Sequence, residues 1–179
     1  MKVIGIIGYP ASGKGEFSDT AKALGIPVFV MGDIIRKKTA EAGLELNDAN
    51  IGSTARALRA EFGMDAVASL TAAEVEKRAA PLAVIDGIRG DAEIRFFKNA
   101  FSDFTAVFVS ASFETRLERM KTRGRSDDTA EPETLRARDR REESFGLKRA
   151  AETADVVIQN ESDRETYLAE VKKILGDVL

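Results

Sequence analysis

Two amino acids that carry much of enzyme chemistry are missing from this chain of 179 residues, which has no cysteine and no histidine. Without cysteine it forms no disulfide and offers neither a thiolate nucleophile nor a zinc–thiolate site. Without histidine it has no imidazole base and no serine–histidine–aspartate triad. Any catalysis must therefore use carboxylates, lysine, arginine, backbone amides or a bound metal ion, which are the groups that phosphoryl transfer needs.

Excess charge and long apolar runs are also scarce. The formal net charge is −3, with 44% hydrophobic and 32% charged residues, as in soluble globular proteins. This balance argues against a general affinity for nucleic acid or anionic membranes. No apolar run approaches the ~20 residues of a membrane span, and the first residues lack a signal-peptide pattern. We expect one cytoplasmic domain over 1–179, with no nucleic-acid or membrane partner.

Short β-rich runs alternate with longer amphipathic runs, which predicts an α/β fold with a parallel sheet covered on both faces. The expected strands are 2–8, 27–32, 81–87, 103–111 and 154–160. The expected helices are 13–25, 33–43, 48–63, 64–79, 91–99, 114–124, 131–146 and 163–179. Residues 33–80 interrupt the alternation as a long all-helical insert, and Asp33 is a candidate N-cap for its first helix.

The stretch IIGYPASGKGEFSD (6–19) contains Gly-x-x-x-x-Gly-Lys between a strand and a helix, the pattern of a phosphate-binding P-loop. Its backbone amides and the following helix N-terminus are expected to surround the phosphates of ATP, and Lys14 to reach the β- and γ-phosphates. The predicted nucleotide-binding residues are Gly8, Tyr9, Pro10, Ala11, Ser12, Gly13, Lys14, Gly15 and Glu16.

The residue after Lys14 departs from the usual pattern. A P-loop normally has Ser or Thr there, whose hydroxyl ligates Mg²⁺, whereas this chain has Gly15 followed by Glu16. A glutamate in the first helical turn is favourable toward the helix dipole, but it repels a triphosphate unless Mg²⁺ or solvent lies between. Ser12 and Ser18 are the hydroxyls that could replace the missing one.

Gly-Lys-Gly also resembles the loop of adenylate kinases and related nucleoside monophosphate kinases, which read Gly-Lys-Gly-Thr. VMGDIIRKK (30–38) is similar to their acceptor-binding Thr-Gly-Asp-x-x-Arg segment, and VIDGIRG (84–90) to their Asp-Gly-Phe-Pro-Arg segment. The resemblance implies that Asp33, Arg36 and Arg89 bind the acceptor and that Asp86 holds Mg²⁺ through water. Solvated surface arginines are the alternative for Arg36 and Arg89. An acid that ends a buried strand is costly without a partner, which favours a role for Asp86.

The arginine-rich segment after the fourth expected strand resembles the lid that closes over the triphosphate in these kinases, here at about 120–142. The candidate lid residues are Arg119, Arg123, Arg125, Arg138 and Arg141, and the first three are expected to act in catalysis. Arg119 and Arg123 are four residues apart, so one helix face can present both. The alternative is a solvated helical hairpin with internal ion pairs, because acidic residues interleave: Asp127, Asp128, Asp139, Glu142 and Glu143.

ADVVIQNESD (154–163) resembles the closing strand and loop of dephospho-coenzyme A kinases, where the backbone flanks the adenine, and this implies a nucleotide contact at Asn160. Asn160-x-x-Asp163 also has the spacing of the guanine-reading Asn-Lys-x-Asp of GTPases, but Glu161 occupies the lysine position. The commoner alternative is a polar loop in which Asp163 caps the last helix.

The chain as a whole resembles an archaeal family of P-loop kinases that are adenylate kinase-like or dephospho-coenzyme A kinase-like. This implies a P-loop NTPase fold with strand order 2-3-1-4-5, a helical acceptor-binding insert (33–80) and a short lid. The implied activity is ATP- and Mg²⁺-dependent phosphotransfer to a small nucleotide-like acceptor. A phosphate acceptor needs no base. An alcohol acceptor, such as the ribose of dephospho-coenzyme A, needs one, with Asp33 the nearest in sequence. A nucleotide-binding switch or slow ATPase stays open because of Gly15.

Overall fold

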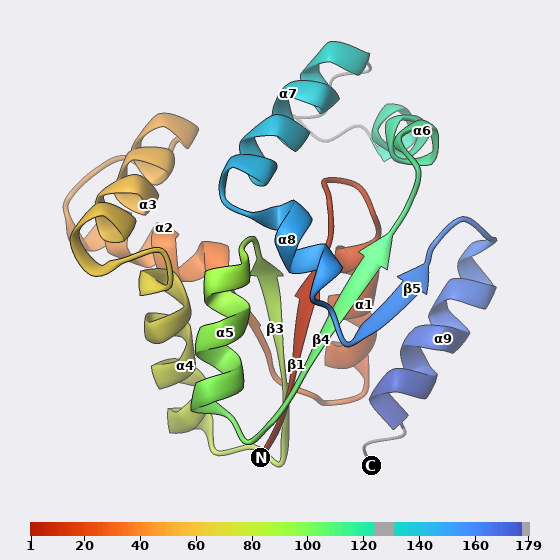
Figure 1. Ribbon diagram of the computed structural model, residues 1–179, viewed down its shortest axis with the longest axis horizontal. Helices are drawn as coiled ribbons and strands as arrows, with labels where there is room; N and C mark the ends of the chain where they lie inside the picture. Colours follow the sequence, from red (N-terminus) through yellow and green to blue (C-terminus); the bar gives the residue numbers. More distant parts are fainter. Residues whose placement is uncertain (124–130, 177–179) are drawn as a thin grey trace.

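The computed structural model describes residues 1–123 and 131–176, in which five strands pair into one parallel sheet (Figure 1). The sheet order is β2-β3-β1-β4-β5, as predicted. The strands are β1 (Lys2–Ile7), β2 (Val28–Val30), β3 (Leu82–Ile88), β4 (Asp103–Ser110) and β5 (Val156–Gln159). The order changes direction at β1, so the carboxyl end of β1 faces the crevice where open α/β sheets bind ligands.

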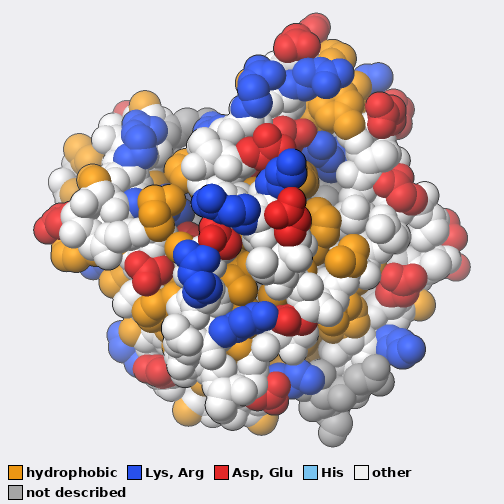
Figure 2. All heavy atoms as spheres, viewed as in Figure 1, with side chains coloured by type: hydrophobic (Ala, Val, Ile, Leu, Met, Phe, Trp, Pro, Cys, Tyr) orange, Lys and Arg blue, Asp and Glu red, His pale blue; other side chains and the backbone are white. Residues whose placement is uncertain are grey.

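Helices connect the strands and cover both faces of the sheet (Figure 1). They are α1 (Lys14–Ala23), α2 (Met31–Glu41), α3 (Asp48–Phe62), α4 (Ala66–Arg78), α5 (Asp91–Ala100), α6 (Phe113–Arg123), α7 (Pro132–Ser144), α8 (Leu147–Glu152) and α9 (Arg164–Gly176). No helix in the described part of the chain is long and apolar enough to cross a membrane. On the face seen in Figure 2, acidic and basic side chains are interspersed and form no broad patch of one sign.

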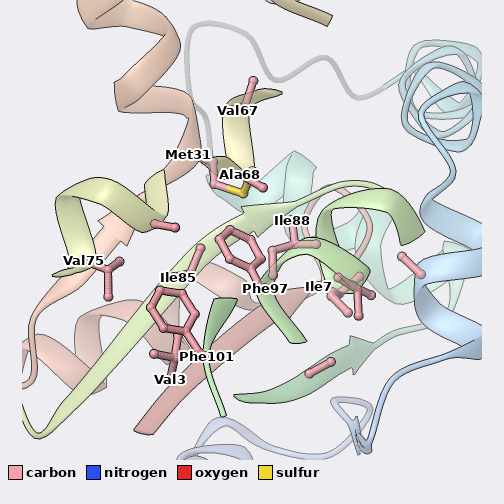
Figure 3. Close-up of a cluster of buried hydrophobic side chains, with 14 of the residues drawn as sticks. Val3, Ile7, Met31, Val67, Ala68, Val75, Ile85, Ile88, Phe97 and Phe101 are labelled. Carbon is pink, nitrogen blue, oxygen red and sulfur yellow. The ribbon is translucent and has the colours of Figure 1, made fainter. Parts of the chain in front are cut away.

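The central strand β1 is apolar because it is covered on both faces, as expected for a parallel sheet. Its side chains alternate between two cores. Val3 and Ile7 pack with α5 residues such as Phe97 (Figure 3). Ile4 and Ile6 face the other way, toward α1 and α9. These two apolar layers hold the β1–α1 loop in place between the sheet and its helices.

The first helix of the insert begins at Met31, two residues before its predicted start, and the prediction that Asp33 is its N-cap is wrong. The N-cap is Val30, and Asp33 lies inside the first turn. Met31 is buried in the core beside the end of β3. Burial of its side chain places the first turn of the helix against the core. The Asp33 carboxylate is thereby turned to Arg36. It still lies in the first turn, where a negative charge suits the helix dipole.

The predicted helix 131–146 ends at Ser144, and a short helix that the sequence did not predict, α8, follows it. Gly146 separates the two with φ of 100°, a left-handed conformation that glycine adopts without steric cost. The end of α7 lies close to the β3–α5 turn, because a Cβ on Gly90 would be 2.5 Å from the Phe145 carbonyl oxygen. The C-terminal end of α7 is therefore packed against the core.

Candidate active site

The loop between β1 and α1 has the backbone of a phosphate cradle. Ala11 (φ 62°) and Gly13 (φ 115°) are both left-handed, and such residues in a turn create concave nests of N–H groups that bind anions. For alanine this conformation costs roughly 1–2 kcal/mol. A Cβ on Gly8 would lie 2.5 Å from the Ser12 hydroxyl, and one on Gly13 would overlap the Asn160 amide. Both glycines of the motif are thus required by space.

Lys14 is folded back onto this loop. Its Nζ donates to the carbonyl of Gly8 and, at 2.9 Å, to that of Tyr9. Burial of the ammonium lowers the pKa of Lys14 to about 8, opposed by the charges of Asp86 and Glu142. The loop thus surrounds an ammonium group that water solvates poorly. Such an environment favours the binding of an anionic ligand.

Asp86 lies beside the P-loop strand, in register with Ile6. Its Oδ2 accepts a hydrogen bond from the Ser18 hydroxyl at 2.8 Å. Burial raises the pKa of Asp86, while the bond from Ser18 and the charge of Lys14 lower it. Of the two hydroxyls considered from sequence, Ser18 therefore lies next to the metal candidate. The Ser12 hydroxyl is buried with no hydrogen-bond partner among the described residues.

These oxygens fit a magnesium ion that shares its ligands with a nucleotide. In the described ranges, 1–123 and 131–176, no group of three or more acidic side chains could hold a metal by itself. Mg²⁺ in kinases usually keeps several waters and is held by one or two carboxylates together with substrate phosphates. Asp86 can supply the carboxylate, and the Ser18 hydroxyl fixes its orientation.

A pocket of about 720 Å³ opens beside the loop. It is lined by residues of the P-loop, α1, the end of β3, α6 and the loop after β5: Pro10, Ala11, Ser12, Gly13, Lys14, Gly15, Glu16, Asp19, Asp86, Arg119, Thr122, Asn160, Ser162 and Arg164. Residues 10–16 of the predicted nucleotide-binding loop thus border one cavity with Asp86, Arg119 and Asn160, whereas Gly8 and Tyr9 do not line it. The cavity is large enough for a small-molecule ligand.

Arg119 and Asn160 join the far side of the pocket to the P-loop. Arg119 donates to the Ser12 carbonyl (3.3 Å), the Asn160 carbonyl (2.9 Å) and the Asn160 side-chain oxygen (3.0 Å). The buried Asn160 amide donates to the same Ser12 carbonyl at 2.8 Å. All of these contacts are to neutral oxygens, so none of them neutralises the positive charge of Arg119.

Glu16 forms an ion pair with Arg164 at the start of α9. From the sequence, we expected Glu16 to repel a triphosphate unless Mg²⁺ or solvent lay between them. Glu16 lies in the first turn of α1, as predicted. Arg164 offsets its charge at the mouth of the pocket. The sequence did not reveal this pair, because the two residues are 148 positions apart.

Arg116 is a second residue of the site that the sequence analysis missed. It is buried, donates to the Pro10 carbonyl at 3.2 Å, and forms a bidentate pair with Asp139 at 2.8 and 2.7 Å. Its guanidinium also lies over the Tyr9 ring, 5.0 Å from the centroid. The Tyr9 hydroxyl donates to Glu143, and burial together with that contact raises the pKa of Tyr9 to about 12. The P-loop is thus attached to both α6 and α7. The spacing of Arg116 three residues before Arg119 was the available signal.

Not all of the remaining lid candidates lie among the described residues. Arg125, Asp127 and Asp128 lie outside the described residues, as does the side chain of Arg123. Arg141 is exposed, with its Nε 4.0 Å from Glu142. In the loop after β5, Asp163 accepts a hydrogen bond from the Thr166 backbone N–H, as the cap of α9 that the sequence offered as the commoner alternative.

The predicted acceptor residues pair with carboxylates. Arg36 contacts Asp33 at 2.5 Å, on one turn of α2. Arg89 contacts Glu142 of α7 at 3.2 Å, and its backbone N–H donates to the buried Glu93. The ends of β2 and β3 lie side by side, as predicted.

The comparisons with known proteins agree with this architecture. Residues 4–146 match the family model of the AAA domain AAA_18. A UPF0200 protein of Methanoculleus marisnigri is 54% identical over 175 residues, which cover 98% of this chain and 96% of the relative.

Two solved structures share the fold. TT1252 from Thermus thermophilus has a TM-score of 0.67 at 22% identity, covering 99% of this chain and 98% of its own. Shikimate kinase from Aquifex aeolicus has a TM-score of 0.58 at 18% identity, with the same coverage. At these identities the structures establish a P-loop kinase-like fold and no particular substrate. Together with the sequence matches, they show that the chain belongs to the UPF0200 family of archaeal proteins, with an AAA domain of P-loop kinase-like fold.

Proposed function

We propose that this protein is an ATP-dependent phosphotransferase that acts on a small, nucleotide-like acceptor. The observation that carries the proposal is the arrangement around Lys14. Its ammonium lies in a loop with left-handed Ala11 and Gly13, in a pocket that Asp86 and Arg119 of α6 also line. Fixed cations around a phosphate cradle are what phosphoryl transfer requires, since the transition state spreads charge over the transferred oxygens.

Each group has a separate task in this proposal. Lys14 leaves the carbonyls of Gly8 and Tyr9 and binds the β- and γ-phosphates. Arg119, already held by the Ser12 and Asn160 oxygens, places its guanidinium toward the triphosphate without reorganisation. Asp86, oriented by the Ser18 hydroxyl, would hold Mg²⁺, which when bound would neutralise phosphate charge. Asn160 lies against the nucleoside end.

The acceptor would bind between the helical insert and the β3–α5 turn. Asp33 and Arg36 come from the insert, and Arg89 from the turn. The shikimate kinase of similar fold is a phosphotransferase by its name, which is consistent with a small acceptor. The missing hydroxyl at Gly15 favours a second candidate, a nucleotide-binding switch or slow ATPase, although Ser18 offers a hydroxyl beside Asp86.

The test is to incubate the protein with ATP·Mg²⁺ and a panel of nucleosides, nucleoside monophosphates and dephospho-coenzyme A, and to measure ADP release. We expect release that depends on one acceptor class. Lys14→Ala should weaken ATP binding in calorimetry by about one to two decades, the value of a lost charge-assisted contact. Lys173→Ala, an exposed lysine of α9, is the matched control and should bind ATP as the wild type does.

Two results would count against the proposal. ADP release that no acceptor accelerates would favour the switch or ATPase. Equal ATP affinity in the wild type and in Lys14→Ala would remove the P-loop assignment itself.

A further inference from the structure

The two arginines proposed to bind the acceptor, Arg36 and Arg89, pair with carboxylates. Arg36 pairs with Asp33 at 2.5 Å, and Arg89 with Glu142 at 3.2 Å. Deeper, Arg59 of the insert pairs with the buried Glu93 at 3.1 Å. These contacts join the insert, the β3–α5 turn and α7. The acceptor side therefore presents hydrogen-bond donors and acceptors in pairs, rather than a cluster of cations.

This charge balance discriminates between acceptor groups. A phosphate that accepts a phosphoryl group is dianionic, and if Arg36 and Arg89 bind it, it lies beside the carboxylates with which they pair, Asp33 and Glu142. Like charges in contact repel each other strongly at the effective dielectric of a protein surface. A hydroxyl carries no charge, can donate to a carboxylate and can accept from a guanidinium. The paired charges thus suit a hydroxyl better than a phosphate.

Glu142 differs from Asp33 both in its exposure and in its effect on the P-loop lysine. It is buried, with its residue 7% exposed, whereas the Asp33 side chain is 63% exposed and turned to Arg36. The charge of Glu142 acts directly on Lys14, second among acids only to Asp86.

The position of Glu142 is fixed by contacts that its neighbours on α7 and just after it make. One turn earlier on α7, Asp139 is clamped by the buried Arg116. Three residues after Glu142, Phe145 packs on Gly90 and beneath the Arg59 guanidinium, 4.9 Å from its ring centroid. Glu142 is thereby held beside Arg89, at 3.2 Å. A catalytic group needs such fixed placement.

We propose that the acceptor of this protein is an alcohol and that Glu142 is the general base that takes the hydroxyl proton. The inference rests on the proposed phosphotransferase function and names its acceptor group. The acceptor oxygen forms a bond to the γ-phosphorus, the bond from that phosphorus to the β,γ-bridging oxygen breaks, and its electron pair leaves with ADP. The proton passes from the hydroxyl to a Glu142 oxygen and then to solvent. Arg89 holds the carboxylate in place.

The experiment has two arms. In the first, the wild-type protein with ATP·Mg²⁺ is given nucleosides, dephospho-coenzyme A and nucleoside monophosphates, and the product is identified by ³¹P NMR. We expect a phosphate monoester, formed on the oxygen of the acceptor's hydroxyl group. A phosphoanhydride product would overturn the proposal, because it comes from a phosphate acceptor.

The second arm compares Glu142→Gln with Glu133→Gln, an exposed glutamate of the same helix. Turnover is measured with the best acceptor, or with water as the acceptor if no panel member reacts. Glu142→Gln should lower kcat at least about 100-fold, the usual range for loss of a general base, with ATP affinity within about twofold. Glu133→Gln should match the wild type. Glu142→Asp keeps a carboxylate and the Arg89 pair, so it should retain more activity than the Gln variant.

The outcomes separate this inference from the function on which it rests. Turnover by Glu142→Gln within about threefold of the wild type removes Glu142 as the base while leaving the kinase intact. Glu142 is also removed as the base if Glu142→Asp is no more active than a folded Gln variant. If the wild type neither binds nor hydrolyses ATP·Mg²⁺, the proposed function fails, and the inference fails with it.

Discussion

Lys14 is a residue whose ionisation the site changes strongly. Its pKa is lowered to about 8 by burial, against about 10.4 in water. A bound triphosphate adds negative charge and raises this pKa again, so at pH values between the two the protein takes up a proton on binding ATP. We predict uptake of about half a proton at pH 8, rising toward one at pH 9.5, as follows from a free pKa near 8. Calorimetry in buffers of different ionisation enthalpy measures it. Uptake near zero at both pH values would mean that Lys14 does not meet the phosphates.

At the scale of elements, the Arg116–Asp139 pair joins α6 to α7 and is almost buried. Asp139→Asn leaves the guanidinium charge uncompensated, and breaking a buried pair in this way typically costs about 3–5 kcal/mol. We predict a loss of that size in the free energy of unfolding, measured by urea denaturation. Glu133→Gln removes an exposed pair with Arg136 on the same helix and should change stability by less than about 0.5 kcal/mol. Equal losses in the two variants would show that α6 and α7 do not depend on the buried pair.

At the scale of the whole molecule, a ligand in the pocket would contact three segments that are distant in sequence: the P-loop, α6 and the loop after β5. A ligand at 100 times its Kd stabilises the folded state by about 2.7 kcal/mol, which for a domain of this size corresponds to roughly 5–11 °C in Tm. We predict such a shift with ATP·Mg²⁺. Gly13→Ala should abolish it, since a Cβ there meets Asn160 at a left-handed φ. Gly15→Ala should retain it, because its Cβ would enter open space. Loss of the shift in both variants would contradict the steric argument.

The sequence by itself determined what depends on neighbours along the chain. Gly8, Gly13 and Lys14 lie within seven residues, and the strand before them and the helix after them have the periodicities that predict those elements. The P-loop and the strand–helix alternation were therefore readable, and the family resemblance supplied the strand order. Asp86 was readable because an acid at the end of a buried strand requires a partner.

Only the tertiary structure decided which side chains meet across the pocket. Arg116 reaches Pro10 over 106 positions, Arg164 reaches Glu16 over 148, and Tyr167 donates to the Gly13 carbonyl over 154. Such contacts depend on how α6, α7 and α9 pack on the sheet, and a charged residue in a charged segment carries no local sign of its partner. Asp33 shows the same limit, because burial of Met31 rather than capping chemistry set where its helix begins. Glu142 was visible in sequence only as one acid among several, and its pairing with Arg89 depends on how the end of α7 packs against the β3–α5 turn.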